Sequence, residues 1–335
     1  MKRLVSEILV TTSDKTYVFD TVASCSIKSS WENLTDTCTI TFPRTLRLRD
    51  QTIIANQLGG EKVFDIGNEI EVKLGYYPNL TTRFKGYITR VSPDANLTFY
   101  CQDEAWNLKK VNVKKSYKDI TLKNLVADWM SSVTIPFVVS DGITFTGFRI
   151  TRNPTVASAL NQLKQKYNGI YAFFREGVLY VGSPFSSFSR NVPRSVFNFQ
   201  HNIVSNDLQY RVKENYEIGV KGVSKLSDNS TIEAFAGVDT GDIRTINFLS
   251  KSQAELQKLC EDALTKYNYT GYNGKFRTFL EPEIKHGEVI DLVDGVLKDR
   301  NSSYRVQGVE TTFGTGGGWQ DINLNLVVET DNEVE

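Results

Sequence analysis

Side-to-side alternation of apolar and polar residues recurs three times within residues 67–103, and it limits the fold more than any other feature of the sequence. The segments that alternate are Glu69–Leu74, Phe84–Val91 and Leu97–Cys101. A period of two is typical of a strand with one face on a core and the other toward water or a neighbour. Proline, asparagine and serine residues supply the turns between the segments. The stretch therefore predicts a three-stranded meander.

A second stretch near the C-terminus repeats this pattern. Residues 286–293 resemble 66–72, residues 304–310 resemble 83–88, and residues 322–326 resemble the third segment. The matched glycines stand 19 residues apart in the first copy and 21 in the second: Gly67 with Gly86, and Gly287 with Gly308. The order, spacing and alternation together predict two related small β domains, one near each end of the chain.

Length and charge limit the class of protein. A chain of 335 residues exceeds one ordinary hydrophobic core and predicts two to four domains. Aromatic residues make up 11% of the chain, which favours β structure. Lysine plus arginine (39) equals aspartate plus glutamate (39), so the net charge is zero. This balance argues against a protein that binds nucleic acid by broad neutralisation of phosphates, and leaves passive contact with DNA in a channel open.

Changes in pattern along the chain predict three domains and a tail. Residues 1–106 alternate throughout and predict a first small β-barrel domain. Residues 107–190 combine two helical patterns with short strands and predict an α+β domain. Residues 191–329 return to alternation around a third helix and predict a second β-barrel domain, and residues 330–335 form an acidic tail. The expected fold class is thus α+β, mainly β, with two barrels and an α+β domain between them.

Capping residues mark where the three helices begin. Thr121 is the expected N-cap of the first helix, whose apolar face begins at Leu122. Asn153, followed by proline, is the expected N-cap of the second. Ser252 and Glu255 have the spacing of a capping box and open the third helix.

Residues that carry chemistry are sparse. His201 and His286 are the only histidines, and neither has a cysteine, glutamate or second histidine at ligand spacing. The run Gly314–Gly318 precedes a strand pattern, so it predicts a hairpin tip and not a phosphate-binding loop. We predict no catalytic, cofactor-binding or metal-binding residues, and hence no enzyme and no cofactor.

One acidic pair keeps an alternative function open. Glu281 and Glu283 form a tight acidic pair in the β regions, and alternation would place both on one face of a strand, with Pro282 on the other. Paired carboxylates perform glycoside hydrolysis. A glycan-binding or cell-wall-degrading protein is therefore the alternative, while a solvated strand edge is the simpler interpretation.

The cysteines and the termini give no sign of export. No cysteine has metal-type spacing, and buried free thiols are the expected state. These cysteines are Cys25, Cys38, Cys101 and Cys260. The first fifteen residues lack the apolar run of a signal peptide, and no segment approaches the length of a membrane span. We expect a protein made and folded in a cytoplasm without a membrane anchor.

Three stretches together resemble a known family. Residues 84–108 are similar to its pattern F-x-G-x-I followed by C-x-D-x-x-x-x-L, and residues 160–182 and 252–269 follow in the same order. The family is that of baseplate hub proteins of phage tails, which includes the late control protein D family and the N-terminal hub half of type VI secretion spike proteins. The resemblance covers most of the chain.

The resemblance implies a structural role. It implies two tail-tube-like β-barrel domains per chain and a homotrimeric ring that adapts a sixfold tail tube to a threefold spike. Implied partners are the tail tube protein, the tape measure protein and other baseplate proteins, with DNA passing through the channel. The chain departs from the spike proteins by ending at Glu335, so a separate spike protein is expected. The implied location is the virion tail baseplate, assembled in the host bacterial cytoplasm.

Overall fold

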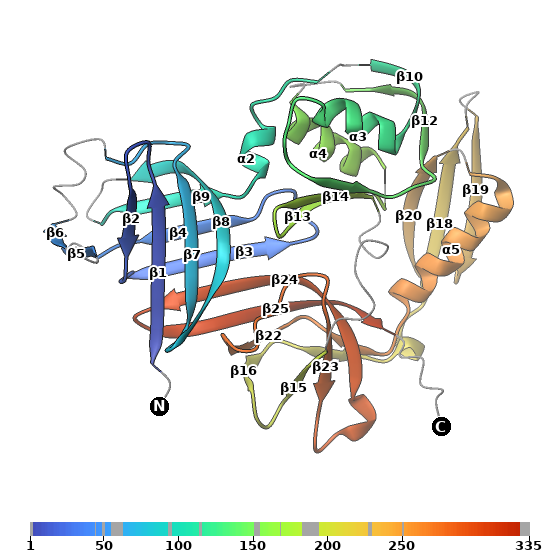
Figure 1. Ribbon diagram of the computed structural model, residues 1–335. Helices are drawn as coiled ribbons and strands as arrows, with labels where there is room; N and C mark the ends of the chain where they lie inside the picture. Colours follow the sequence, from blue (N-terminus) through green and yellow to red (C-terminus); the bar gives the residue numbers. More distant parts are fainter. Residues whose placement is uncertain are drawn as a thin grey trace.

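The computed structural model is mainly β, as the sequence predicts, with short helices (Figure 1). It describes residues 3–43, 45–48, 51–54, 63–92, 96–113, 116–150, 155–167, 169–182, 194–226, 230–249 and 251–328. The predicted acidic tail, 330–335, lies outside these residues. Within the described ranges no helix has the length and the hydropathy that crossing a membrane requires.

The N-terminal unit contains the first meander. Antiparallel pairing orders its strands β3-β4-β9-β8-β7-β1-β2, followed by the hairpin β5-β6. Each long strand alternates between buried and exposed side chains, so that Ile8, Val72 and Phe99 meet in one core. Cys25, Cys38 and Cys101 are buried free thiols, and so is Cys260 in a separate core, as predicted. The bounds are β1 Leu4–Thr11, β2 Thr16–Phe19, β3 Ser24–Ser30, β4 Thr37–Thr41, β5 Thr45–Leu48, β6 Gln51–Ile54, β7 Glu69–Tyr76, β8 Asn79–Ser92 and β9 Thr98–Gln102.

The C-terminal unit contains the second meander. Its strands follow the order β16-β22-β25-β24-β23, with β15 pairing parallel to β23. A second core lies beneath it, around Phe197, Tyr304 and Ile322. The bounds are β15 Ser195–Asn198, β16 Ile203–Asn206, β17 Gln209–Arg211, β21 Gly271–Asn273, β22 Lys275–Phe279, β23 Val289–Val293, β24 Ser302–Gly314 and β25 Gly317–Val328.

The two meanders share a specific backbone geometry. Gly67 N donates to Ile88 O at 2.7 Å, and Gly287 N donates to Val306 O at 2.7 Å. One residue further on, each strand carries a bulge: Thr89 is the extra residue of β8 opposite β9, and Gln307 is the extra residue of β24 opposite β25. The repeat predicted from sequence is therefore confirmed by matching turns and matching bulges.

One detail of the predicted repeat is wrong. The turn and bulge make Ile88 equivalent to Val306, so Arg90 is equivalent to Gly308. Gly86 lies two residues before the shared position, and Gly308 lies two residues after it. Gly86 is required because a Cβ there would lie 2.1 Å from Gln102 O. The two glycines answer separate steric demands and are not counterparts.

A single sheet connects the two units. β24 pairs antiparallel with β3, so the described strands run continuously from β8 and β9 through β4, β3, β24, β25 and β22 to β16. Figure 1 shows this path descending from β9 and β4 through β3 and β24 to β16. Among the described strands no pairing closes either unit into a barrel.

The α+β region between the units packs above the sheet (Figure 1). The apolar faces of its helices form a third core with Phe145 and Leu179. Thr121 caps α3 as predicted, but α4 is capped by Thr155, so the predicted Asn153 cap is wrong; Asn153 and Pro154 lie outside the described residues. The bounds are α2 Ala105–Leu108, β10 Ser116–Thr121, α3 Leu122–Met130, β11 Phe137–Val139, β12 Thr144–Arg149, α4 Val156–Lys166, β13 Tyr171–Arg175 and β14 Val178–Gly182.

The third helix stands outside the second meander. The predicted capping box at Ser252 and Glu255 is present and opens α5. α5 covers a separate sheet ordered β19-β18-β20, with its own core around Val220, Leu256 and Cys260. This small layer is inserted between β17 and β21, whereas the sequence pattern placed the helix within a second barrel. The bounds are β18 Ile218–Lys225, β19 Thr231–Gly237, β20 Asp242–Leu249 and α5 Gln253–Tyr267.

Candidate functional site: the seam between the two meanders

The pairing of β3 with β24, which we call the seam, unites the two repeats. Seven residues of each strand take part, from Ser24 opposite Gly314 to Ser30 opposite Gly308. On the polar face Lys28 Nζ lies 3.3 Å from Glu310 Oε1, and Ser26 Oγ donates to the same oxygen at 3.3 Å. Exposed ion pairs of this kind contribute little. The backbone ladder and the apolar face therefore hold the seam.

Apolar side chains cross the seam in both directions. Leu280 and Phe313 belong to the C-terminal unit but pack into the core of the N-terminal unit. Trp31, which follows β3 and is fully buried, donates from Nε1 to Val306 O at 3.2 Å. Separating the units would therefore expose part of the N-terminal core and break the hydrogen bond of the buried Trp31 indole.

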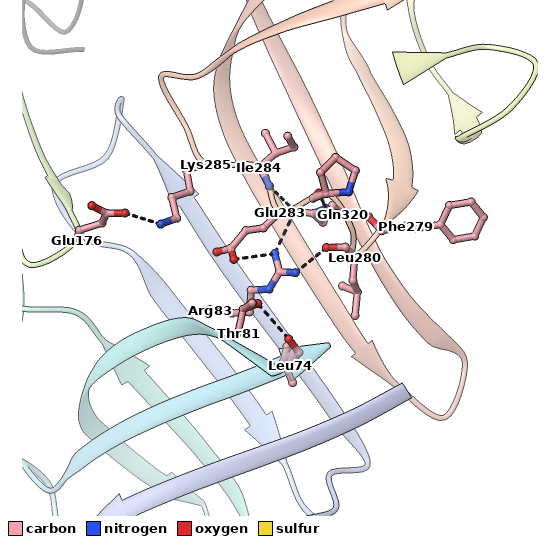
Figure 2. Close-up of polar contacts among 11 residues, drawn as sticks. Leu74, Thr81, Arg83, Glu176, Phe279, Leu280, Glu283, Ile284, Lys285 and Gln320 are labelled. Carbon is pink, nitrogen blue, oxygen red and sulfur yellow. Dashed lines mark hydrogen bonds and ion pairs between the residues drawn. The ribbon is translucent and has the colours of Figure 1, made fainter. Parts of the chain in front are cut away.

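Arg83 of β8 makes a buried polar contact across the same boundary (Figure 2). Its side chain is only 4% exposed. Nη2 donates to Leu280 O at 2.6 Å and Nη1 to Gln320 Oε1 at 3.5 Å, while Glu283 Oε2 lies 3.8 Å from Nη1. Burial lowers the pKa of the guanidinium, and the charge of Glu283 opposes that shift. The group remains a cation, and the C-terminal unit supplies its compensation.

Gln320 of β25 organises the acceptors around Arg83. The residue is fully buried. Its Nε2 donates to Phe279 O and to Pro282 O, both at 2.8 Å, and its Oε1 also accepts from Ile284 N at 3.1 Å. These bonds hold residues 279–284 in the turn that presents Leu280 O and Glu283 to Arg83. A buried amide with both ends satisfied fixes this turn in one conformation.

The β13–β14 hairpin of the α+β region is attached to the same loop. Lys285 pairs with Glu176, and Arg175 Nη2 lies 3.6 Å from Glu288 Oε1. His286 Nε2 lies 3.1 Å from Phe174 O, and the histidine is 2% exposed. Burial lowers the pKa of His286 to about 4, so the ring is neutral at pH 7. Three parts of the chain therefore meet at residues 283–288.

Two carboxyl groups join the N-terminal unit to the start of α2. Asp36 accepts from Ser29 Oγ at 2.6 Å, and Asp36 N donates to Asp103 Oδ2 at 3.0 Å. Burial raises the pKa of Asp36 to about 7, and burial, followed by the neighbouring charge of Asp36, raises that of Asp103. Both line a cavity of about 460 Å³ that Arg83 also borders. The hydrogen bonds tie the β3–β4 turn to the segment that leads into the α+β region.

The residues that the sequence suggests as candidates for chemistry do not lie together in the structure. His201 is exposed in the turn after β15, far along the chain from the buried His286. Glu281 and Glu283 lie in the loop after β22 and not on a strand, so the predicted strand face is wrong. The run Gly314–Gly318 forms the β24–β25 hairpin turn, as predicted. Within the described ranges no cluster of three or more metal-ligating side chains exists.

Sequence reasoning missed Arg83 and Gln320. Each stands in an alternating strand as an ordinary polar residue, and no local pattern marks Arg83 as buried. The only available signal was the phase of alternation, since Gln320 falls on the apolar face with Ile322 and Leu324. A polar residue in phase with a core face is a candidate for a buried hydrogen-bond centre.

Comparisons with known proteins place the fold. No family model and no curated relative matches the sequence. The tail protein from Neisseria meningitidis MC58 has a similar structure, with a TM-score of 0.65, 14% identity and 97% of each chain covered. The 43 kDa tail protein of prophage MuSo2 from Shewanella oneidensis gives 0.60 and 12%, covering 95% of this chain and 96% of that one.

A secretion protein shares the same architecture. The E. coli c3393 protein, a component of the type VI secretion system described as similar to T4 tail proteins gp27 and gp5, gives a TM-score of 0.57 at 8% identity. It covers 96% of this chain and 77% of its own. The predicted resemblance to phage tail and type VI spike proteins is therefore confirmed at the level of the fold.

Replacing Arg83 by methionine tests the buried contact. The substitution keeps much of the side-chain volume but leaves Leu280 O without its donor and Glu283 without its ion-pair partner. We expect the free energy of unfolding in urea to fall by about 2–4 kcal/mol. Lys85→Met on the same strand is the matched control, because that side chain is 69% exposed, and it should change stability by less than about 0.5 kcal/mol. Equal midpoints for both variants would contradict the assignment.

The pH dependence of stability tests the buried carboxyl pair. In the folded protein the pKa of Asp36 is about 7, above its ordinary value of 3.8, so acidification from pH 8 favours the folded state. His286 has the opposite effect on stability. Its pKa is lowered in the folded protein, so it reduces stability only at pH values below its ordinary pKa of 6.5. The thermal midpoint should therefore rise between pH 8 and pH 6.5, and Asp36→Asn should flatten the rise. Parallel profiles for wild type and variant would refute this.

Proposed function

We propose that this chain is a structural baseplate hub protein of a phage tail or a related contractile injection machine. Three chains form a ring that adapts a sixfold tail tube to a threefold central spike. The observation that carries the proposal is the seam. Through it, two similar units of one chain join into one continuous sheet. Three such chains present six units, which matches sixfold and threefold neighbours at once.

The polar face of the sheet supports a role as channel lining. Tyr100, Thr39, Ser26 and Thr312 lie side by side across β9, β4, β3 and β24. In a neighbouring row Lys28 faces Glu310, and on the next strands Arg277 Nη2 lies 2.8 Å from Asp321 Oδ2. Charges that are neutralised by their neighbours offer DNA or an extended polypeptide little to bind. Such a face suits passage of the tape measure protein and DNA.

The proposed role requires no catalysis. Glu283 lies against buried Arg83, and Pro282 O accepts from Gln320, so the Glu281–Glu283 segment is part of the contact between the units. This favours structure over the alternative, a glycan-binding or cell-wall-degrading tail-associated protein. Hydrolysis of peptidoglycan that is lost on Glu283→Gln, with the fold intact, would reverse that preference.

Assembly and location follow from the same proposal. The ring lies in the virion tail baseplate after assembly in the host bacterial cytoplasm. It contacts the tail tube protein on one side and a separate spike protein on the other, and the α+β region faces other baseplate proteins. The likeness in fold to the Neisseria and Shewanella tail proteins along nearly their whole length supports this placement.

The oligomeric state provides the test. Multi-angle light scattering of the purified chain, across a concentration series, should give the mass of a trimer at the upper end. Electron micrographs of native particles labelled through an antibody to this chain should show a ring at the junction of tube and spike. A monomer at every concentration, together with particles that lack such a ring, would contradict the proposal.

A further inference from the structure

The small layer under α5 stands apart from the continuous sheet and takes no part in the seam. β17 and β21, which flank it in the chain, pair directly with each other through Tyr210 opposite Tyr272. The layer has its own core, in which Val220, Leu256 and Cys260 are buried. Within the described part of the chain none of its strands pairs with either meander. A role for this layer must therefore be sought in its own surface.

One edge of this three-stranded layer is covered by side chains of α5. The strand order is β19-β18-β20, so β19 and β20 are its two edges (Figure 1). Gln253 Nε2 donates to Glu233 O of β19 at 2.8 Å. One helical turn further on, Gln257 Nε2 donates to Phe235 O of the same strand at 3.0 Å. The two glutamines occupy acceptors that a further strand would need, and so they protect the β19 edge from pairing.

The opposite edge, β20, has no such cover. Asp242 N donates to Glu217 O on the β18 side at 2.8 Å, and successive residues of a strand direct their backbone groups to opposite sides. The backbone groups of Ile243, Thr245 and Asn247 therefore point away from β18. Among the described residues no strand or side chain bonds to these outward groups, and all three residues are exposed. β20 thus presents a free strand edge eight residues long.

The side chains along β20 indicate what this edge accepts. The segment Thr245–Leu249 contains no charged residue. Phe248 is only partly buried and packs at the margin of the layer's core, as does Tyr267 of α5. Arg244 is the one cation of the strand: its guanidinium carbon lies 4.5 Å from the Tyr267 centroid, and its Nε lies 3.6 Å from Asp242 Oδ2. An added strand would therefore meet an uncharged, partly apolar strip with a cation near one end.

We propose that β20 binds an extended segment of a different protein of the same assembly, which adds to this layer as a fourth strand. The inference rests on the proposed function and assigns one partner contact within it. The segment is apolar where it lies beside Thr245–Leu249 and carries a carboxylate that reaches Arg244. In strand addition, main-chain hydrogen bonds supply affinity and alternate side chains supply specificity. An edge of this length that stayed unpaired would favour aggregation.

Symmetry and the covered edge argue against a second copy of this chain as the occupant. Pairing of β20 with β20 of another copy would put the same surface on both sides of the contact, which gives twofold symmetry. The proposed ring is threefold. A head-to-tail contact between two such layers would need the β19 edge, which Gln253 and Gln257 cover. These two constraints favour a separate polypeptide.

Hydrogen exchange, measured on the purified chain and on native particles, tests the edge. The outward amides of Ile243, Thr245 and Asn247 should exchange on the order of tenfold more slowly in the particle, because they gain hydrogen-bond acceptors there. The β19 peptide, Thr231–Gly237, is the internal control and should exchange alike in both samples. Equal exchange of β20 in both samples would contradict the proposal. Protection already present in the purified chain would assign the edge to this chain or to a second copy of it, and would overturn the proposal too.

Substitutions at one position separate strand addition from other contacts. Thr245→Pro removes an outward N–H and leaves the ladder to β18 intact, because proline is tolerated on the free side of an edge strand. Particles that carry this variant should lose the added protection of Ile243 and Asn247. Thr245→Val keeps the N–H and the branched shape, and it should retain the protection.

A charge at the same position gives a second readout that does not depend on how the proline variant folds. Thr245→Lys keeps the N–H but places a cation in the uncharged strip, so it should also abolish the added protection of β20. Protection that survives in the lysine variant would contradict the proposal. A ring in micrographs without added protection of β20 would overturn this inference alone, whereas particles that lack the ring would contradict the proposed function as well.

Discussion

Backbone hydrogen bonding between the edges of β3 and β24 is the constraint on which the rest of the structure depends. An open sheet ends in a row of donors and acceptors that need partners. Here one repeat satisfies the edge of the other, and the pairing of Ser24–Ser30 with Gly308–Gly314 turns two small sheets into one. The bulge after Val306 makes this possible, because the strand leaves β23 there and becomes available to β3.

Burial of polar groups then fixes how the joined units sit. Arg83 and Gln320 come from opposite units, and the Arg83 guanidinium reaches its acceptors, Leu280 O and Gln320 Oε1, only when both units are in place. Apolar packing through Leu280 and Phe313 holds the units together, but hydrophobic burial is non-directional and does not fix their orientation. The polar contacts supply the direction, because a misplaced unit would leave a buried guanidinium without acceptors. The loop at 283–288 extends the same control to the β13–β14 hairpin.

Local patterns in the sequence predicted much of this fold. They did not predict the contacts between residues that are far apart in the chain. Alternation located both meanders, and caps such as Thr121 and Ser252 located helix starts, because these signals act over a few residues. The glycine spacing aligned Gly86 with Gly308, and this alignment is wrong. The number of residues between the turn glycine and the bulge differs between the two meanders. The separate layer under α5 was missed because its strands alternate like those of the meanders. The contact of Arg83 with Gln320 spans 237 positions, and no local pattern encodes it.

Hydrogen exchange measured by mass spectrometry on the native chain tests the continuous sheet most directly. If the seam is integral to the fold, peptides covering Ser24–Ser30 and Gly308–Gly314 should be strongly protected and should lose protection together as urea is raised. Their exchange should then follow the same unfolding free energy as peptides from β4 and β25. Rapid exchange of β3 and of the second half of β24, with β4 and β25 still protected, would show two independent sheets and contradict the account.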